Sequence, residues 1–196
     1  MKRLLMVATI APTLRAFLLP IAHHIRSLGW QADGMAQGIS DCPECAHAFD
    51  QTWEVDWSRN PLAPQNLLRT PRAIRNLVER EGYDLVHVHT PVGAFVTRYA
   101  LRKRAAPRVI YTAHGFHFYR GGHPLKNALF LALEKAAGRW TDYLIVINRE
   151  DERAAQRHRI VSADKVCYMP GIGVDTSIYR PEAVSTVQVQ QVRQDL

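Results

Sequence analysis

Four segments decide the fold of this chain: YDLVHVHTPVG at 83–93, RVIYTAHGFHFYRGG at 108–122, TDYLIVINREDE at 141–152 and VCYMPGIGVDTSIYRP at 166–181. In each segment an apolar run of strand length ends in a turn rich in histidine, glycine, proline or other polar residues. Open α/β sheets bind ligands beyond the carboxyl ends of their strands. The residues able to carry chemistry therefore lie just after the strands, where an open α/β sheet binds its ligand.

The segments on either side continue the same alternation of strands and helices. Apolar runs predict strands at 3–9, 84–88, 108–113, 142–147 and 165–169, with weaker strands at 30–35 and 52–57. Helical spacing covers 14–28, 67–81, 91–104, 125–138 and a segment from 149 onward, whereas 11–13 is predicted to be a turn and 37–51 a loop or short irregular structure. Alternating strands and helices predict an α/β fold, a Rossmann-like parallel sheet with helices on both faces.

Several residues set the predicted helix boundaries. Pro20 is expected to kink the first long helix or delay its start, and Gly29 to end it. Thr70 before Pro71 predicts the start of a helix that Gly82 stops. Asn148 is placed to cap the helix from 149 onward, where acidic residues suit the positive end of the helix dipole.

Composition indicates an ordinary globular chain with a basic surface. Its 196 residues are 47% hydrophobic, enough for one α/β domain with a real core. The apolar run at 4–11 is too short to span a bilayer and has no cleavage site after it, so we expect a cytoplasmic protein without a signal peptide. The net charge of +7 favours anionic partners, although a solvated basic face explains it equally well. Nucleic acid is not expected, because no aromatic-interleaved basic motif is present. The basic residues cluster at Arg69, Arg72, Arg75 and Arg80, and again at Arg98, Arg102, Lys103, Arg104 and Arg108.

The three cysteines do not favour a metal or redox site. Cys42 and Cys45 form one CxxC, which is half of a zinc site, and no second pair follows. A surface loop with reduced thiols is the prediction, and a metal or redox role is the alternative. Cys167 falls in a strand predicted to be buried.

The turns after the strands supply the candidate site. His87 and His89 point to one side of a strand, with His87 expected in the core and His89 expected to reach a cleft. His114 follows a strand directly and could bind a hydroxyl or a phosphate, while Gly115 allows close approach of a ligand. The loop beyond it adds further sugar or phosphate contacts from Phe116, Tyr119, Arg120, Gly121 and Gly122.

The known nucleotide-binding fingerprints are missing. The turn at 170–173 is glycine-rich but lacks the lysine and hydroxyl residue of a P-loop. The turn after the first strand, TIAPT at 9–13, contains no glycine. These two observations argue against a dinucleotide-dependent dehydrogenase.

The order of the motifs YDLVHVHTP, VIYTAHGFHFYRG, TDYLIVINREDE and PGIGVDTSIYRP resembles the N-terminal half of family-4 glycosyltransferases of the GT-B fold, of the bacterial polysaccharide type. The resemblance implies two Rossmann-like domains, of which the first receives the acceptor and the second holds a nucleotide-sugar. It implies sugar transfer with retention, the nucleotide-sugar being a co-substrate, with no cofactor and no obligatory metal. It also implies a catalytic role for His114, and substrate binding by His89, Thr90, Gly115, Phe116, His117, Tyr119, Arg120 and Gly173.

The same resemblance predicts the domain organisation and the partners. Residues 1–178 are expected to form the acceptor-side domain, and 179–196 a linker and the start of an absent donor domain. The expected partners are a nucleotide-sugar, a lipid-linked or oligosaccharide acceptor, and either the missing domain or a second copy of the chain. The basic helix around Arg69–Arg80 could place the protein on an anionic membrane at its inner face.

Two other classes of function stay open at this stage. One is a non-catalytic α/β module that docks to a partner or to an anionic membrane through its exposed cleft face. The other is a metal-dependent hydrolase that uses the imidazoles of His87, His89, His114 and His117.

Overall fold

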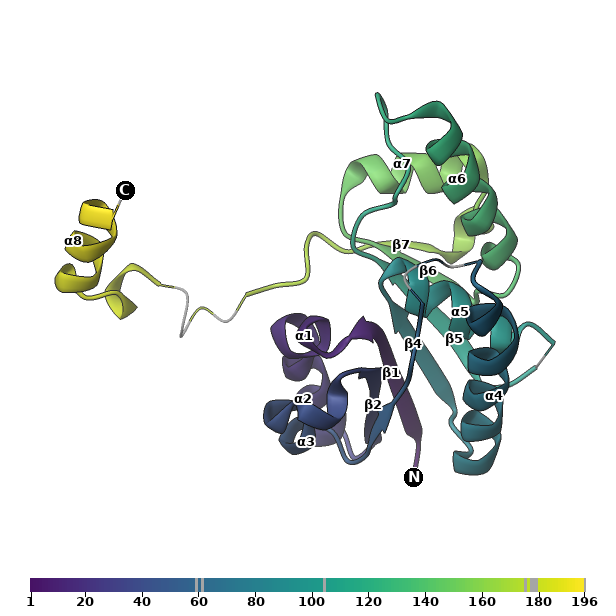
Figure 1. Ribbon diagram of the computed structural model, residues 1–196, viewed down its shortest axis with the longest axis horizontal. Helices are drawn as coiled ribbons and strands as arrows, with labels where there is room; N and C mark the ends of the chain where they lie inside the picture. The colour runs from purple at the N-terminus through teal and green to yellow at the C-terminus, as the bar shows by residue number, and fades with distance from the viewer. Residues whose placement is uncertain (59, 61, 104, 175, 177–179, 196) are drawn as a thin grey trace.

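A parallel sheet with the strand order β3-β2-β1-β4-β5-β6-β7 organises the computed structural model, which describes residues 1–58, 60, 62–103, 105–174, 176 and 180–195 (Figure 1). The order reverses between β1 and β4, so this pair is the switch point of the sheet. The predicted parallel α/β sheet is thereby confirmed. The strands are β1 (Arg3–Ile10), β2 (Gln31–Gln37), β3 (Thr52–Glu54), β4 (Leu85–His89), β5 (Arg108–Ala113), β6 (Tyr143–Val146) and β7 (Val166–Tyr168).

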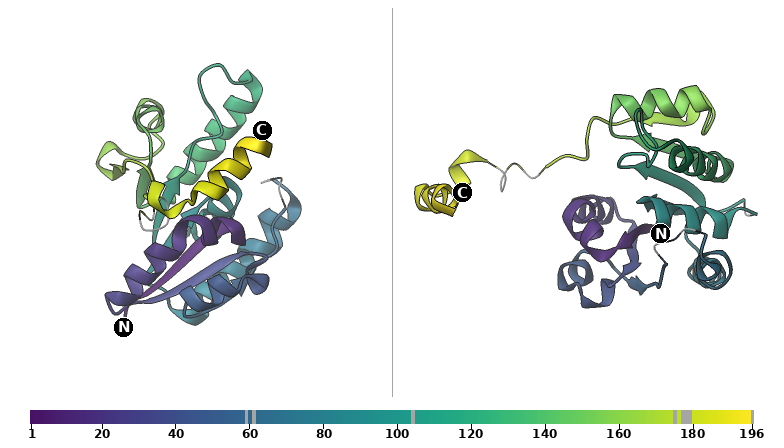
Figure 2. Two further views of the ribbon diagram at one scale, coloured as in Figure 1. Left: turned by 90° about the vertical axis from the view of Figure 1, so that its left-hand side faces the viewer. Right: turned by 45° about the horizontal axis from the view of Figure 1, so that its top comes forward.

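Helices cover both faces of the sheet, as expected (Figure 2). Alternate residues of β1 point to opposite faces: Leu4 and Met6 join one buried cluster, and Leu5 and Val7 join the other. The first face carries α1 (Ala11–Thr13), η1 (Leu14–Leu18), α2 (Leu19–Ser27) and α3 (Pro43–Ala48). The second carries α4 (Thr70–Glu81), α5 (Pro91–Leu101), α6 (Pro124–Gly138) and α7 (Arg149–His158).

The first face is covered over β1 and β2 but open farther along the sheet. Tyr143 on β6 is 52% exposed, and Cys167 on β7, the register partner of Ile145 on the same face of β6, is exposed too. The prediction of a buried Cys167 is therefore wrong. An apolar run indicates a strand, but it does not show whether a helix covers each of the two faces of that strand.

Two π-helical turns precede prolines. The turn η1 ends directly before α2, whose second residue is Pro20, and η3 (Gln65–Arg69) ends directly before α4, whose second residue is Pro71. Proline has no N–H for the bond to the fourth residue before it, which explains why the helix widens there. The helical segment starts at Ala11, so the turn predicted for 11–13 is wrong. Thr70 does not cap α4 with its side chain, because its hydroxyl donates to the carbonyl of Asp56.

Glycine and asparagine end and begin helices as predicted. Gly29 and Gly82 have φ of 81° and 66°, a left-handed conformation that stops a helix without strain. Asn148 accepts a hydrogen bond from the amide of Asp151 and so caps α7.

The segment predicted as a loop at 37–51 contains η2 (Ile39–Asp41) and α3. Cys42 caps α3 and is joined to Cys45 by a disulfide. Cys45 is fully buried and Cys42 almost so, within the cluster formed by α2 and β1. The prediction of a surface loop with reduced thiols is thus wrong. The helix was missed because six residues are too few for a visible period.

The basic cluster near residue 100 is not simply a solvated face. Arg98 is 1% exposed, stacks on the ring of Tyr111 and pairs with Glu134 at 3.0 Å. Arg108 pairs with Asp142 at the surface, and Arg104 lies outside the described residues. Arg98 therefore ties α5 to α6 and β5 instead of meeting an anionic partner.

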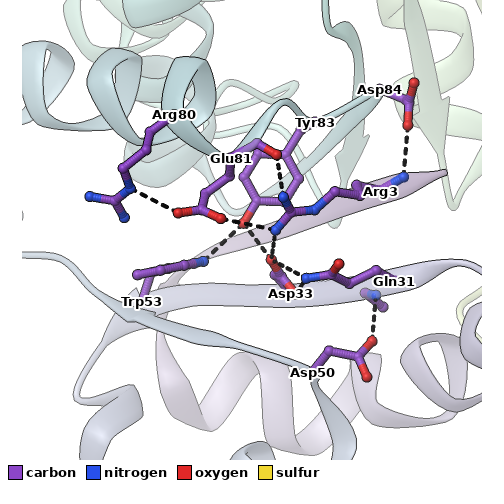
Figure 3. Close-up of polar contacts among 10 residues, drawn as sticks. Arg3, Gln31, Asp33, Asp50, Trp53, Arg80, Glu81, Tyr83 and Asp84 are labelled. Atoms are coloured by element: carbon purple, nitrogen blue, oxygen red, sulfur yellow. Dashed lines mark hydrogen bonds and ion pairs between the residues drawn. The ribbon is translucent and has the colours of Figure 1, made fainter. Parts of the chain in front are cut away.

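A polar network holds together the N-terminal ends of the strands (Figure 3). Asp33 is fully buried on β2, and its carboxylate accepts from the hydroxyl of Tyr83 at 2.6 Å and from Arg3 at 3.4 Å. Trp53 donates its indole N–H to the same hydroxyl at 2.9 Å, and Glu81 pairs with Arg3 at 3.0 Å. Burial and the neighbouring Asp33 raise the pKa of Tyr83, so the phenol stays a donor. This network joins β1, β2 and β3 to the end of α4.

The C-terminal segment stands apart from the sheet. After η4 (Ala163–Lys165) and β7, the chain reaches η5 (Pro181–Ala183) and α8 (Thr186–Asp195), which buries no residue and lies away from the sheet in Figure 1. The boundary predicted near residue 179 falls on residues outside those described. None of the helices in the described part of the chain has both the length and the hydrophobicity of a membrane span.

Candidate active site

Two threonines meet at the switch point of the sheet. Thr9 lies near the end of β1, and Thr90 directly follows β4. The amide of Thr9 donates to the hydroxyl oxygen of Thr90 at 2.8 Å, and the two hydroxyl oxygens lie 2.7 Å apart. Ligands of open α/β sheets bind beyond the strand ends at such a point. The pair therefore marks the place where a ligand is expected.

Thr90 holds a strained backbone. Its φ of 62° and ψ of 144° fall in a region that β-branched residues avoid, at a cost of about 1–3 kcal/mol. Besides its bonds to Thr9, the Thr90 hydroxyl donates to the carbonyl of His89. The amide of Gly93 donates to the hydroxyl of Thr9 at 3.1 Å, and a Cβ on Gly93 would lie only 3.1 Å from the backbone nitrogen of Thr9. A close approach of α5 to β1 thus supports the strained turn.

Three imidazoles lie on, or directly after, the neighbouring strands β4 and β5. His87 and His89 share one side of β4, with ring centroids 4.1 Å apart. Nδ1 of His89 lies 3.0 Å from Nε2 of His114, which directly follows β5. Nε2 of His87 lies 2.8 Å from the hydroxyl of Thr112. The sequence placed His87 and His89 on one side of a strand, which the structure confirms, but it did not indicate that His89 and His114 share a hydrogen bond.

Burial keeps the three rings neutral. Burial lowers the pKa of His87 to about 4, with a further contribution from His114. Burial also holds the pKa of His89 well below its ordinary value, helped by both neighbouring imidazoles, and it lowers the pKa of His114. At neutral pH the cluster therefore offers uncharged donors and acceptors, not cations.

The loop that carries His114 is held from α7. Gly115 has φ of 130°, which suits glycine, and the next amide, of Phe116, donates to both carboxylate oxygens of Asp151 at 3.3 Å. Asn148 donates its side-chain amide to the same carboxylate at 2.8 Å. Asp151 is 7% exposed, so it is a buried acceptor that positions the turn after β5.

The structure separates the predicted substrate-binding residues into two groups. His89 is 1% exposed, so it reaches a ligand only through His114, and Phe116 is buried and stacks on Phe118 at 4.9 Å between ring centroids. Direct contact by these two side chains was predicted wrongly, because Phe116 packs in the apolar core and the ring of His89 is buried against those of His87 and His114. The other predicted residues are partly or fully exposed: Thr90, His114, Gly115, His117, Tyr119, Arg120 and Gly173.

Two hollows adjoin the threonine pair. The larger, about 630 Å³, is lined by Thr9, Ile10, Thr13, Gln37, Trp57, Ser58 and Thr90. We call it the switch-point hollow. The smaller, about 150 Å³, is lined by Thr9, Pro91, Val92, Phe95, His117, Phe130, Leu133 and Glu134, between α5 and α6. We call it the apolar slot. Thr9 lines both, so they meet at the end of β1.

Some residues of the site were not found from the sequence. Thr9, Gln37 and Trp57 line the hollow, and the ring of Phe17 lies 6.2 Å from that of His114 between centroids. The only sequence signal of Thr9, Gln37 and Trp57 is a position at or shortly after the end of a strand on one side of the switch point, and Phe17 on η1 has no such signal. The reversal of strand order, which gives that position its meaning, is not visible in a periodicity.

The histidines do not form a metal centre. The ring of His117 packs against that of Phe130, with centroids 5.2 Å apart, whereas the ring contacts among the described histidines join only His87, His89 and His114. Within the described part of the chain, no three His, Cys, Asp or Glu residues are arranged to hold a metal ion. The geometry thus gives the hydrolase hypothesis no ligand set.

Comparisons with known proteins agree with this arrangement. The family model described as Glycosyltransferase Family 4 matches residues 17–177. EpsD of Bacillus subtilis (strain 168), whose name is that of a glycosyltransferase, is 36% identical over 98% of this chain and 49% of its own length. The chain therefore spans about half the length of this relative.

A second relative and a solved structure are more distant. A UDP-Gal:alpha-D-GlcNAc-diphosphoundecaprenol alpha-1,3-galactosyltransferase of Escherichia coli is 29% identical over 56% of this chain and 28% of its own length. The crystal structure of a glycosyltransferase from Rickettsia africae ESF-5 superimposes with a TM-score of 0.68 at 14% identity, over 99% of this chain and 49% of that one. The structural likeness shows the fold alone.

Proposed function

The chain belongs to glycosyltransferase family 4, and on that premise we propose that it forms the acceptor-side lobe of a retaining enzyme. This enzyme transfers a sugar from a nucleotide-sugar to a lipid-linked or polysaccharide acceptor. Membership of a transferase family favours this function over a non-catalytic docking module. The observation that carries the proposal is the switch-point hollow, which meets the strained Thr90 turn at the end of β4.

The lining of the hollow suits a sugar acceptor. Thr9, Thr13, Ser58 and Gln37 supply hydroxyl and amide groups, and Ile10 with the largely buried Trp57 forms the apolar part of the wall. Few but well-placed polar groups on a partly apolar wall are typical of small-ligand sites. We infer that an acceptor hydroxyl enters here and meets the nucleotide-sugar that a second lobe holds above it.

His114 orients the reacting sugar in this proposal. The transition state of sugar transfer carries positive charge on the ring and negative charge on the leaving diphosphate. A neutral imidazole, held by His89, contributes a fixed dipole without adding charge. Groups that neutralise the diphosphate belong to the second lobe, as the family resemblance implies. The nucleotide-sugar is a substrate, and the reaction needs no further cofactor.

The apolar slot favours a lipid-linked acceptor. Val92, Phe95, Phe130 and Leu133 line it, and it begins at Thr9, where the hollow ends. A sugar in the hollow could therefore place the first part of its lipid carrier between α5 and α6. The name of the Escherichia coli relative contains a diphosphoundecaprenol acceptor, which is of this chemical class.

The start of α6 is the membrane-facing surface in this proposal, at the inner face of the membrane. Leu125 and Leu129 are 77% and 46% exposed, and Tyr119 in the loop before them is 62% exposed. Lys126 and Arg120 stand exposed among them and suit anionic headgroups. The sequence suggested α4 as the membrane-binding helix, but Arg75 on that helix donates a hydrogen bond to the carbonyl of Ala100 instead of facing headgroups.

Sugar transfer tests the proposed function. The chain is fused to the second half of the Bacillus subtilis relative, and transfer is measured from a panel of radiolabelled nucleotide-sugars to undecaprenyl-diphosphate-linked acceptors. We expect transfer by the fusion, a loss of about 10²–10³-fold in the His114→Ala variant, and little or no transfer by the 196-residue chain alone. Robust transfer by the isolated chain would refute a half-enzyme.

Vesicle binding tests the membrane surface. A Leu125→Gln, Leu129→Gln variant is expected to lose binding to phosphatidylglycerol vesicles. The matched control is Leu68→Gln, because Leu68 is 70% exposed on η3. If the double variant binds as the wild type does, while Arg69→Glu with Arg72→Glu does not, the membrane face is α4 instead.

A further inference from the structure

His89 is a buried histidine with one ring nitrogen in a hydrogen bond and the other in none. The residue is 1% exposed, and Nδ1 lies 3.0 Å from Nε2 of His114. Nε2 is buried and has no hydrogen-bond partner in the part of the chain that the structure describes. A neutral imidazole carries one N–H and one bare nitrogen. One nitrogen of His89 therefore carries the proton and the other is bare, and only one of the two takes part in a hydrogen bond.

Only two arrangements of protons satisfy the bond between the rings. In the first, Nδ1–H of His89 donates to Nε2 of His114, and the unpartnered Nε2 of His89 is bare. In the second, Nε2–H of His114 donates to His89, and the proton of His89 sits on its unpartnered Nε2. Among buried backbone groups, an N–H without an acceptor is rarer than an under-satisfied carbonyl, and we apply the same preference to the imidazole N–H. The first arrangement is therefore favoured.

We propose that His89 sets the tautomer of His114, so that His114 accepts through Nε2 and presents Nδ1–H as its remaining polar group. His114 is partly exposed, whereas His89 is not. The part of His114 that a ligand can meet is thus a hydrogen-bond donor and not a base. His89 is a positioning residue, since it acts only through His114.

This assignment restricts the ligand chemistry at His114. An Nδ1–H group suits an oxygen that accepts, such as a sugar hydroxyl oxygen or a phosphate oxygen, and it cannot take a proton from an attacking hydroxyl. Sugar transfer with retention makes no demand for a base at this place. The inference about substrate atoms rests on the proposed function, whereas the tautomer itself does not.

The burial of the cluster supports a neutral form for both rings. The pKa of His89 lies well below its ordinary value and that of His114 is lowered, both because of burial. A charged His114 would donate from both nitrogens and would leave His89 as the acceptor, with its own N–H unpartnered. The same buried environment therefore disfavours the charged form and the second tautomer.

The experiment is ¹⁵N–¹H correlation of the histidine rings in the ¹⁵N-labelled chain, without substrate and at a pH well above the ordinary histidine pKa. Protonated and bare ring nitrogens resonate at opposite ends of the ¹⁵N range, so the tautomer is read directly. We expect a protonated Nδ1 and a bare Nε2 at His114. A protonated Nε2 at His114 in the wild type overturns the proposal.

Two nearly isosteric variants test the role of His89. In His89→Asp the carboxylate can only accept, so His114 is expected to move its proton to Nε2. In His89→Asn the side-chain amide can donate as Nδ1–H does, so His114 is expected to keep the proton on Nδ1. An unchanged tautomer in folded His89→Asp contradicts a positioning role. Should that variant fail to fold, the wild-type spectrum still decides the assignment.

This measurement is independent of the transfer assay. If the tautomer assignment proved wrong, the proposed glycosyltransferase function would still stand. If the fusion failed to transfer sugar, the tautomer assignment would still stand. In the two-lobed fusion, His89→Asn is expected to keep kcat within a few-fold of wild type, while His89→Asp lowers kcat with little change in the KM for acceptor.

Discussion

The hydroxyl oxygens of Thr9 and Thr90 lie 2.7 Å apart, although 81 residues separate them in the chain. This contact joins the ends of β1 and β4, where the strand order reverses, and it holds Thr90 at a φ of 62°. Strain of this kind persists only where the surrounding bonds over-determine it. The pair is therefore both a structural support and a wall of the candidate acceptor site.

Replacing Thr9 with valine tests this support. Valine has the shape of threonine without its hydroxyl, so the Gly93 amide and the Thr90 hydroxyl lose a partner. We expect the free energy of unfolding to fall by about 1–3 kcal/mol in urea denaturation. Thr9→Ser is the matched control, because it keeps the hydroxyl. Equal stability of the two variants would show that the contact contributes nothing.

Asp151 is expected to control the order of the turn that carries His114. In Asp151→Ala the amide of Phe116 loses its acceptor, at a cost of about 1–3 kcal/mol in stability. Hydrogen exchange at the Phe116 amide is expected to become faster relative to the amides of β5. The control is Glu150→Ala, an exposed position on the same turn of α7. Unchanged exchange at Phe116 in Asp151→Ala would rule out this anchoring role.

The free energy of unfolding is expected to decrease as the pH is lowered below the ordinary histidine pKa. An unfolded histidine binds a proton near pH 6.5, whereas His87 in the folded state binds it only near its lowered pKa of about 4. Between these values the unfolded state binds more protons, so acid favours unfolding and stability rises with pH. At about 1.4 kcal/mol per pKa unit, His87 alone accounts for roughly 3 kcal/mol, and His89 adds to the loss.

Urea denaturation at a series of pH values measures this dependence. His87→Phe is expected to flatten the curve between about pH 6.5 and 4. The matched control, His123→Gln, removes an exposed histidine and is expected to leave the slope unchanged. A wild-type curve that is flat across this window would contradict the neutral, buried cluster.

Tyr83→Phe is expected to weaken the fold without touching the site. The phenol hydroxyl bridges Trp53 and the buried carboxylate of Asp33 (Figure 3). These contacts lie at the end of the sheet where the strands begin, whereas the switch-point hollow lies where β1 and β4 end. Its loss leaves that carboxylate with weaker partners and is expected to cost about 1–3 kcal/mol. Acceptor binding, measured by titration, is expected to stay at the wild-type value. A loss of binding without a loss of stability would contradict the separation of these two ends.

The sequence predicted the parallel sheet because its strands are apolar runs joined by helices of clear period. It did not predict α3, which is too short to show a helical period. It also did not show which face of each strand a helix covers, so the exposure of Cys167 was missed. It placed His114 directly after a strand, as the structure does, and its role there stays a prediction. It misjudged His89 and Phe116, since a position at a strand end does not show which side chains the core retains. Asp151 and Thr9 act through contacts distant in sequence, which no local pattern contains.

The most direct test of the central claim is a titration of the ¹⁵N-labelled chain with a short, soluble acceptor, a farnesyl-diphosphate-linked N-acetylglucosamine, and separately with a nucleotide-sugar. If this chain is the acceptor lobe, the acceptor analogue binds saturably. It then shifts the amides of Thr9, Thr90 and His114, while the nucleotide-sugar alone shifts them little. Saturable binding of the nucleotide-sugar at these residues, with no response to the acceptor, would contradict the account.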